Sequence, residues 1–527
     1  MISMNKTHRS TNLFTLLLTA AAFLTSSCAP LPSNVDRELS FALEDTEGTT
    51  FGRLYQKLKP ENSLESGFYL LLQGLDAFTA RLVLAQGAEK SIDAQYYLIH
   101  GDLTGILFLD QLIKAADRGV RVRLLIDDMD LGDYDEGLSI LAQHENIELR
   151  IFNPFSRATT RLTQYMSRFG SVTRRMHNKS FTVDNQLSVV GGRNIGDEYF
   201  EADSALAFGD IDLLVMGPLV REVSNSFDLY WNNSNAYPIE SLRPDLIDLT
   251  SLTAGRQLLA DYLEQDATKK YLQALSSSQI AKEIRNGSVT YSWATGQVLS
   301  DHPDKIKSYE TTEQFSLAKL INPFLKEVKS ELLIFSPYFV PGKKGTKFLT
   351  DLSRSGVKVR IITNSLASTD VGLVHAGYAK YRRQLLRGGV ELFEIDRELS
   401  KEERKKRGQL AGSSKSSLHA KSFVLDRKKV FIGSLNLDPR SVTENTEIGI
   451  LVNSVELADL VAEVFEKVVN VATFKLDLQK DDEGPELMLW HGYENGQKKV
   501  WASDPYTSFW RRFSIRLLGI LPIESQL

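Results

Sequence analysis

The stretch HNKSFTVDNQLSVVGGRN, residues 177–194, decides the fold of this chain, because its design returns at residues 419–436 as HAKSFVLDRKKVFIGSLN. Both stretches contain the pattern H-x-K-x-x-x-x-D, and their His residues are 242 positions apart. Each also carries an Asn 17 positions after its His, and composition alone predicts far fewer than one such match. Paired His, Lys and Asn sets are what phosphodiester chemistry through a covalent phosphohistidine needs. The repeat therefore favours an enzyme.

Each stretch predicts a β-hairpin that gathers one His, one Lys and one Asn. Side chains at positions i and i+2 of a strand point to the same face, so the His and the Lys of each set project together. A polar turn and a second apolar strand follow, and they return the Asn alongside the His of its own hairpin. The two predicted sets are His177, Lys179 and Asn194, and His419, Lys421 and Asn436.

The chemistry of these sets follows from their charges. A neutral imidazole can attack phosphorus, and a protonated one can donate a proton to the departing alkoxide. Lys ammonium groups and Asn amides supply charge and donors for the non-bridging oxygens. Asp184 and Asp426 open the turns, where local backbone bonding is their expected task and a direct chemical role is the alternative. A Lys beside each His disfavours a dication, so we expect no metal and no cofactor.

Each His needs an acid on its other ring nitrogen to fix the tautomer. Asp210, in FGDIDLLV, and Glu447, in NTEIGILV, occupy matching places five residues before a Val. Within the first half, Asp210 or its rival Asp212 would serve His177, and Glu447 is the matching acid of the second half.

The repeat extends beyond the hairpins. SIDAQYYLIH (91–100) matches LLIFSPYFVP (332–341), and RGVRVRLLIDD (118–128) matches SGVKVRIITNS (355–365). Strands alternate with helices before each hairpin, which indicates α/β layers. Two such halves, related by a pseudo-twofold axis, would share one active-site cleft. We expect a first half at 64–240, a helical connector at 241–300, a second half at 301–475 and a C-terminal segment at 476–527.

Residues 1–28 have the layout of a bacterial lipoprotein signal: a basic start, then a 12-residue apolar run at 13–24 that is too short to span a bilayer. Cys28, the only cysteine, stands where such signals carry their lipid, although Thr25 replaces the usual Leu. We therefore expect lipidation of Cys28, a tether at 29–63 and a membrane-anchored protein that faces the periplasm. An ordinary cleaved signal is the alternative.

The C-terminus TSFWRRFSIRLLGILP (507–522) predicts an amphipathic helix. Apolar residues recur along one face with an interfacial Trp and basic neighbours, which is typical of a helix in a membrane surface. A helix packed on the domain is the alternative. These residues are Phe509, Trp510, Phe513, Leu517 and Ile520, with Arg511, Arg512 and Arg516. The charged stretch at 401–417 predicts a solvated loop, with headgroup contact or a lid role as the alternative.

Charge separates the candidate partners. The formal net charge of −5 and a pI near 6.0 speak against general binding of polyanions. A phospholipid membrane is therefore favoured as the partner, and no nucleic acid is expected.

The paired motifs and their GGRN and GSLN runs resemble the phospholipase D superfamily. Longer strings, RRMHNKSFTVD, GGRNIGDEYF, NSLASTDVGLVHAGYAKYRRQLL, IGSLNLDPRS and SFWRRFSIRLLGILP, resemble the C-type branch of bacterial cardiolipin synthases over residues 64–527. The resemblance implies transfer of a phosphatidyl group from phosphatidylethanolamine or phosphatidylglycerol to phosphatidylglycerol. It also implies His177 as the favoured nucleophile, His419 as acid and base, Lys and Asn on the phosphate, and Asp184 and Asp426 completing the motifs. A phospholipid hydrolase, a nuclease and an inactive surface-binding protein are the alternatives.

Overall fold

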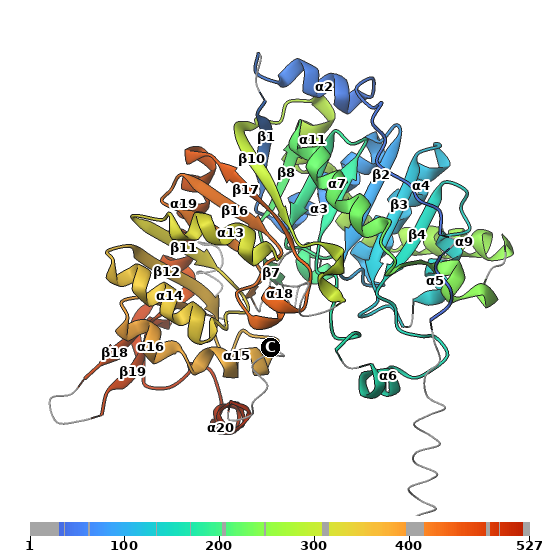
Figure 1. Ribbon diagram of the computed structural model, residues 1–527. Helices are drawn as coiled ribbons and strands as arrows, with labels where there is room; N and C mark the ends of the chain where they lie inside the picture. The colour runs from blue at the N-terminus through green and yellow to red at the C-terminus, as the bar shows by residue number, and fades with distance from the viewer. Residues whose placement is uncertain are drawn as a thin grey trace, which may run out of the picture.

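The computed structural model describes residues 31–519, except 36, 62–63, 133, 169, 203–206, 247–248, 308–315, 397–415, 481–484 and 495. Cys28 and almost all of the charged stretch at 401–417 therefore lie outside the described residues. Within the described part, two halves of alternating helices and strands join in one 18-stranded sheet (Figure 1). The predicted α/β class with a repeated half is confirmed.

The first half has the strand order β9-β4-β3-β2-β5-β6-β8-β1. Its central strands β2, β3 and β4 run parallel and are buried on both faces, as is usual for parallel strands covered by helices. One face is apolar, and the other carries the buried ion pair of Asp93 and Arg123. The strands are β1 (Ser66–Leu71), β2 (Ser91–Tyr96), β3 (Arg121–Asp127), β4 (Ile147–Phe152), β5 (Ser180–Val183), β6 (Leu187–Gly191), β8 (Asp212–Met216) and β9 (Ala236–Pro238). The helices are α3 (Gly74–Gly87), α4 (Leu103–Asp117), α5 (Asp135–Leu141), α6 (Arg161–Ser167), α7 (Leu219–Trp231) and α8 (Ile239–Leu242).

The second half repeats this order as β18-β13-β12-β11-β15-β16-β17-β10, and β19 and β20 extend it beyond β18. Its strands are β10 (Ser292–Ser300), β11 (Glu331–Phe335), β12 (Lys358–Asn364), β13 (Glu391–Ile395), β15 (Ser422–Leu425), β16 (Lys429–Gly433), β17 (Ile448–Asn453), β18 (Thr473–Gln479), β19 (Leu487–Glu494) and β20 (Gln497–Trp501). Its helices are α13 (Leu317–Lys326), α14 (Gly342–Arg354), α15 (Gly372–Ala379), α16 (Arg382–Arg387), α18 (Pro439–Thr443), α19 (Val455–Ala472) and α20 (Phe509–Leu518).

Strand β10 joins the two halves. Its first residues pair with β1 from Ser292 to Ala294, and the rest pair with β17 from Thr295 to Ser300. The connector expected at 241–300 is therefore shorter, and its helices are α9 (Leu249–Leu263), α10 (Asp266–Ser277) and α11 (Gln279–Asn286). The sequence SWATGQVLS does not predict this strand, because the strand is mostly half-buried and its apolar and polar residues do not alternate cleanly.

Both ends of the described chain differ from expectation. The segment predicted as a tether contains α2 (Thr50–Leu58) and is docked on the first half. The amide of Asn34 donates to the carbonyls of Ser234 and Ala236 at 2.9 Å, and the Arg37 guanidinium donates to the Asn232 carbonyl at 2.8 Å. The composition of this segment does not predict these polar contacts. At the other end, strands β18 to β20 precede the predicted helix.

One apolar core spans the two halves and fixes how they face each other. It contains Phe68, Val190 and Leu213 from the first half and Val430, Ile450 and Val452 from the second, all essentially buried. Each such side chain contributes roughly 1.5–3 kcal/mol when fully buried. Because the hairpin strands β6 and β16 both supply residues to this core, the two His hairpins are held in one orientation.

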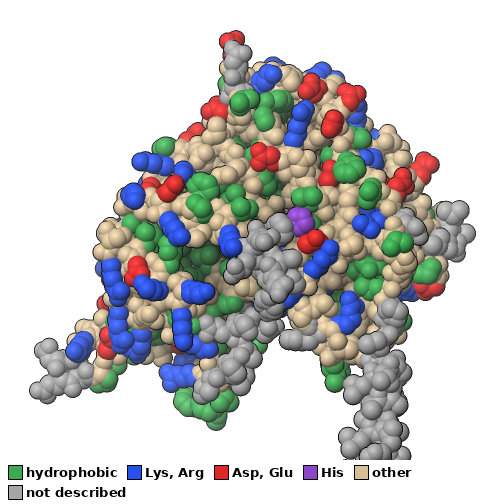
Figure 2. Space-filling view, viewed as in Figure 1, with side chains coloured by type: hydrophobic (Ala, Val, Ile, Leu, Met, Phe, Trp, Pro, Cys, Tyr) green, Lys and Arg blue, Asp and Glu red, His purple; other side chains and the backbone are tan. Residues whose placement is uncertain are grey.

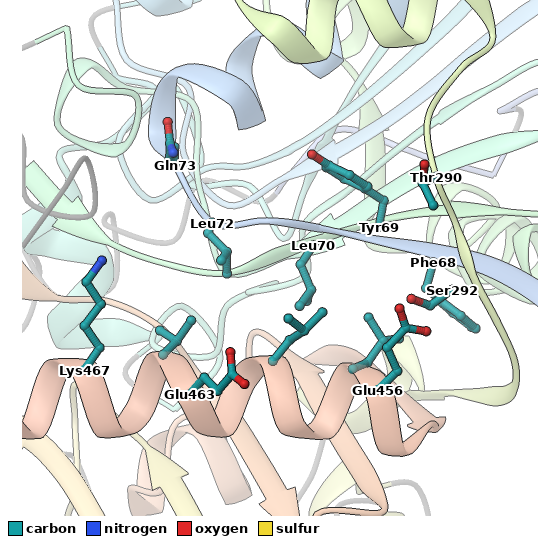
Figure 3. Close-up of a pocket in the computed structure, with 13 residues that line it drawn as sticks. Phe68, Tyr69, Leu70, Leu72, Gln73, Thr290, Ser292, Glu456, Glu463 and Lys467 are labelled. Atoms are coloured by element: carbon teal, nitrogen blue, oxygen red, sulfur yellow. The ribbon is translucent and has the colours of Figure 1, made fainter.

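Two grooves in the described structure lie away from the His residues. A groove of about 670 Å³ lies beside α2 and α3, and one of about 610 Å³ lies between β1 and α19, lined by Leu70, Leu72, Glu463 and Lys467 among others (Figure 3). Neither contains a member of the predicted His, Lys and Asn sets. None of the described helices is long and apolar enough to cross a bilayer.

Candidate active site

The two motif hairpins form as predicted, but their His residues precede the strands. Strand β5 begins at Ser180 and β15 begins at Ser422, so each His and Lys pair lies in the extended segment just before its strand. Asp184 and Asp426 open the turns with φ of 50° and 53°. This left-handed region is accessible to Asp more easily than to most residues, which explains an Asp at each turn.

Backbone pairing between the halves places each His. The His177 N–H donates to the Thr446 carbonyl at 2.8 Å, directly before Glu447. The His419 N–H donates to the Gly209 carbonyl at 2.8 Å, directly before Asp210. On that side β7 (Ala207–Gly209) and β14 (Ser416–Leu418) form a short parallel pair. Each His segment therefore runs beside the acid of the other half.

The His–acid contacts are consequently crossed. Nδ1 of His177 lies 2.8 Å from Oε2 of Glu447, and Nδ1 of His419 lies 2.6 Å from Oδ2 of Asp210. The expectation that Asp210 or Asp212 would serve His177 is wrong. Asp212 instead forms ion pairs with Arg81 at 2.9 Å and Arg193 at 3.3 Å.

The two Lys side chains fold back onto their own His residues. Nζ of Lys179 donates to the His177 carbonyl at 2.6 Å, and Nζ of Lys421 donates to the His419 carbonyl. Nζ of Lys421 also lies 2.8 Å from Nδ1 of His419. Burial lowers the pKa of Lys421 to about 8, against the opposing pull of Asp210 and Glu447. Burial likewise lowers the pKa of Lys179 well below its usual value.

Both imidazoles are almost buried, with 8% and 7% of their surface exposed for His177 and His419. Burial, reinforced by the charges of both Lys179 and Lys421, holds each imidazole pKa well below the usual value. Both rings are therefore neutral near pH 7. A neutral ring that donates from Nδ1 to a carboxylate keeps the lone pair of Nε2 for an electrophile. Because each Lys acts on both rings, the two sets form one site.

The Asn residues take less symmetric places. Nδ2 of Asn194 donates to the Tyr199 hydroxyl at 2.9 Å, and the Tyr199 ring lies edge-on to His419, with 5.1 Å between centroids. The hairpin pattern placed Asn194 alongside His177. Its hydrogen bond instead leads, through Tyr199, towards His419 of the other half. Among the described residues, the buried amide oxygens of Asn194 and Asn436 have no hydrogen-bond partner. A half-turn of either amide would exchange this oxygen for the NH₂, the group that can donate to a phosphate.

Asp184 and Asp426 have structural tasks. The Asp184 carboxylate accepts backbone N–H groups from Glu89, Lys90 and Ser91, and the Asp426 carboxylate accepts those from Lys329, Ser330 and Glu331. Each carboxylate thereby ties its hairpin turn to the start of β2 or β11. Within the described part of the chain, the partners of both carboxylates are backbone and Ser330 groups and not a His, so the geometry favours the structural task over a direct chemical role.

Sequence patterns missed several residues of the site. The Tyr97 ring lies edge-on to His177, with 4.9 Å between centroids, and no motif in the sequence singled it out. Behind Glu447, Oδ2 of Asp301 accepts the Glu447 N–H at 2.8 Å and the Lys305 ammonium at 3.0 Å. Nothing in the run DHPDK indicates this role.

Comparison with known proteins gives consistent results. Residues 82–231 and 321–469 match the family described as "Cardiolipin synthase, PLD-like domain". Cardiolipin synthase C of Escherichia coli is 38% identical over 87% of this chain and 96% of its own length. An uncharacterised protein of Helicobacter pylori is 32% identical over 91% of this chain and 93% of its own. The crystal structure of a phosphatidylserine synthase from Haemophilus influenzae has the same fold, with a TM-score of 0.54, 15% identity, and coverage of 90% and 100% of the two chains.

Proposed function

This chain belongs to the phospholipase D-like family of cardiolipin synthases, and we propose that it moves a phosphatidyl group from a phospholipid to a hydroxyl of phosphatidylglycerol, which yields cardiolipin. The donor is phosphatidylethanolamine or a second phosphatidylglycerol. The observation that carries the proposal is the pair of crossed His–acid contacts in one buried, Lys-rich site. Such a site offers two imidazoles to one phosphodiester, as a transfer in two steps requires.

In the first step, Nε2 of His177 attacks phosphorus and the bond to the donor headgroup oxygen breaks. His419 gives its proton to that oxygen. It carries this proton in the substrate complex, because the phosphate brings negative charge beside the imidazole and offsets the two Lys charges. In the second step, His419 takes the proton of the acceptor hydroxyl, the hydroxyl oxygen attacks phosphorus, and the bond to His177 breaks. The Lys ammonium groups stabilise the extra charge in both transition states.

Support for a lipid over a nucleic acid comes from a pocket next to the site. The pocket has a volume of about 380 Å³, and one of its lining residues is Leu437, which follows Asn436 in the chain. Its walls are mostly apolar and include Phe339, Phe348 and Val442. An apolar pocket suits an acyl chain, whereas nucleic-acid sites are polar and strongly basic. The acidic net charge points the same way.

A product analysis tests the proposal. The purified protein is given labelled phosphatidylglycerol with and without phosphatidylethanolamine, and the expected product is cardiolipin. Phosphatidic acid without cardiolipin would instead establish the phospholipid hydrolase. Short incubation followed by denaturation should trap a lipid phosphate on His177. His177→Ala should abolish turnover, and His491→Ala, at an exposed strand position, should not. If no His carried a phosphate, the covalent mechanism would be wrong.

A further inference from the structure

Helix α20 exposes a cluster of aromatic side chains. Phe509, Trp510 and Phe513 are 64%, 72% and 50% exposed, and Leu517 is 57% exposed. The three rings contact one another, with centroids 5.5 to 6.3 Å apart, so they form one continuous apolar face. Contiguous exposed aromatics are unfavourable in water and usually mark an interaction surface.

The other face of α20 attaches the helix to the protein. The helix packs on α15, where Ile515 approaches Gly372 so closely that a Cβ there would lie 3.0 Å from its Cδ1. The N-cap Ser508 accepts the Arg511 N–H at 3.2 Å, and Arg512 donates to the Thr507 carbonyl. The helix therefore packs on the domain, and its aromatic face stays exposed; its place in a membrane surface stays a prediction.

A second exposed apolar surface belongs to the first half. Leu162 and Met166 of α6 are 71% and 73% exposed and lie one helical turn apart. The helix is anchored from behind, because the Arg161 guanidinium donates to the Met129 carbonyl at 2.7 Å. Figure 1 shows α6 and α20 at the same end of the molecule, one below each half.

Both helices are connected to the catalytic site by short segments. Helix α6 ends ten residues before His177. Helix α15, which carries α20, begins two residues after Asp370, whose carboxylate accepts the Tyr338 hydroxyl at 2.6 Å and acts on the charge of Lys421. The apolar surfaces thus flank the site from both halves.

Positive charge accompanies α20. A groove of about 450 Å³ lies between α15, α16 and α20, and its described lining contains several basic residues and one carboxylate, Asp504. The basic residues are Lys380, Arg382, Arg383, Arg512 and Arg516. Arg382 is buried and paired with Glu394 and Asp504, and Arg383 is paired with Glu486. The charge that α20 itself brings is therefore that of Arg512 and Arg516. Figure 2 shows the corresponding pattern, with Lys and Arg side chains directly above the apolar patch at the lower end of the second half. Apolar side chains flanked by cations fit the interface of an anionic bilayer.

We propose that α6 and α20 form a two-point docking surface for a bilayer of anionic phospholipid, which presents the lipid phosphate to the His site. Aromatic and aliphatic side chains enter the acyl boundary, and the basic groove meets the headgroups. The inference rests on the proposed function in one respect: a lipid substrate explains why the site should face a bilayer. Docking itself requires no turnover.

Vesicle flotation tests the docking surface without catalysis. All proteins carry His177→Ala, which removes turnover, and Cys28→Ser, which removes any acyl anchor. Vesicles contain phosphatidylcholine alone or with phosphatidylglycerol. Phe509→Ser with Trp510→Ser and Phe513→Ser, and separately Leu162→Ser with Met166→Ser, should each weaken binding to the anionic vesicles by roughly tenfold. Phosphatidylcholine alone should bind less well than the mixture.

Leu258→Ser is the matched control, because Leu258 is 69% exposed on α9, a helix that is not part of the proposed surface. It should leave binding unchanged, and circular dichroism should show each variant folded. Binding equal to the parent protein in both Ser sets would overturn the proposal. A dimer dissolved by the same substitutions, with vesicle binding retained, would assign the surface to self-association. Absence of cardiolipin synthesis would refute the proposed function but leave the flotation result intact.

Discussion

The crossed contacts make each half chemically incomplete. Glu447 orients His177 and Asp210 orients His419, so neither His has the acid of its own half within contact. The two acids also differ in their surroundings. Burial raises the pKa of Glu447 to about 7, and Asp301 and Lys305 lie behind it. Arg193 donates to the Asp210 carbonyl, which leaves a positive charge behind that acid instead.

Replacing each acid should therefore impair a different imidazole. Glu447→Gln should slow attack by His177, and Asp210→Asn should slow protonation of the leaving group by His419, each by roughly 10²-fold or more. A donor with a nitrophenol leaving group needs no protonation, so it should rescue Asp210→Asn but not Glu447→Gln. Steady-state rates with both donors measure this. Rescue of Glu447→Gln alone would exchange the roles of the two His residues.

The pH dependence of activity follows from two groups. The value of kcat/KM should fall as pH drops through about 7. Below that pH the Glu447 carboxyl is protonated and no longer holds the His177 N–H as a carboxylate does. It should fall again as pH rises through about 8, because the Lys421 ammonium loses its proton. Lys421→Arg should move only the alkaline limb upwards, since an Arg stays charged. A soluble short-chain donor keeps membrane binding out of the measurement.

At the scale of elements, the hairpin turns depend on Asp184 and Asp426. Asp184→Ala would leave the N–H groups of Glu89, Lys90 and Ser91 without their acceptor, at about 1–3 kcal/mol for each that stays buried. We expect a lower Tm with little change in kcat at a temperature where the variant is folded. Asp426→Ala should cost less, because its carboxylate is partly exposed.

Thermal unfolding and initial rates, measured on the same samples, distinguish a structural task of Asp184 and Asp426 from a direct role in the chemistry. Asp184→Asn retains one acceptor oxygen and should lie between the parent and Asp184→Ala in Tm. An unchanged Tm with a lost kcat would restore the chemical role that the motif implies.

Local patterns predicted the repeated elements well, and long-range pairing explains what they missed. The hairpins, the α/β alternation and the C-terminal helix follow from residues close in sequence. Which acid serves which His depends on the pairing of Gly209 with His419 and of Thr446 with His177, across more than 200 residues. No periodicity encodes such a contact. Strand β10 and the docked segment after residue 31 were missed because their contacts are polar or half-buried.

The pocket beside α13, α14 and α18 gives an element-scale test of acyl-chain binding. Val442→Trp should fill part of its volume of about 380 Å³ and lower kcat/KM for long-chain donors by roughly tenfold or more. Val442→Ala is the matched control and should be tolerated, because it enlarges the pocket. Vesicle binding should be normal in both, which distinguishes this pocket from the α6 and α20 surface. Equal loss for short-chain donors would mean that the Trp distorts the site itself.

For the whole molecule, the shared core and the crossed contacts have one consequence: the halves act as a single catalytic body with a defined lower end. In the view of Figure 1, the described chain starts at the lower outer edge of the first half, on the side where α6 lies. Asn34 and Arg37 are already docked on the first half. Three residue steps separate Cys28 from position 31, which span at most about 11 Å. The stretch expected as a long tether therefore contributes very little reach.

A lipid on Cys28 would consequently hold the α6 and α20 surface directly against the membrane. We propose that the mature protein begins at a lipidated Cys28 and faces the periplasm. Each buried CH₂ of an acyl chain contributes about 0.8 kcal/mol, so two or three chains make the anchor stable. Cys28→Ser should release the protein to the soluble fraction or leave its signal uncleaved, as fractionation and the mass of the N-terminal peptide would show. A mature protein that begins elsewhere, without added lipid mass, would contradict the anchor. Docking by α6 and α20 would then have to hold the site at the bilayer unaided, and the Phe509, Trp510 and Phe513 substitutions should release it.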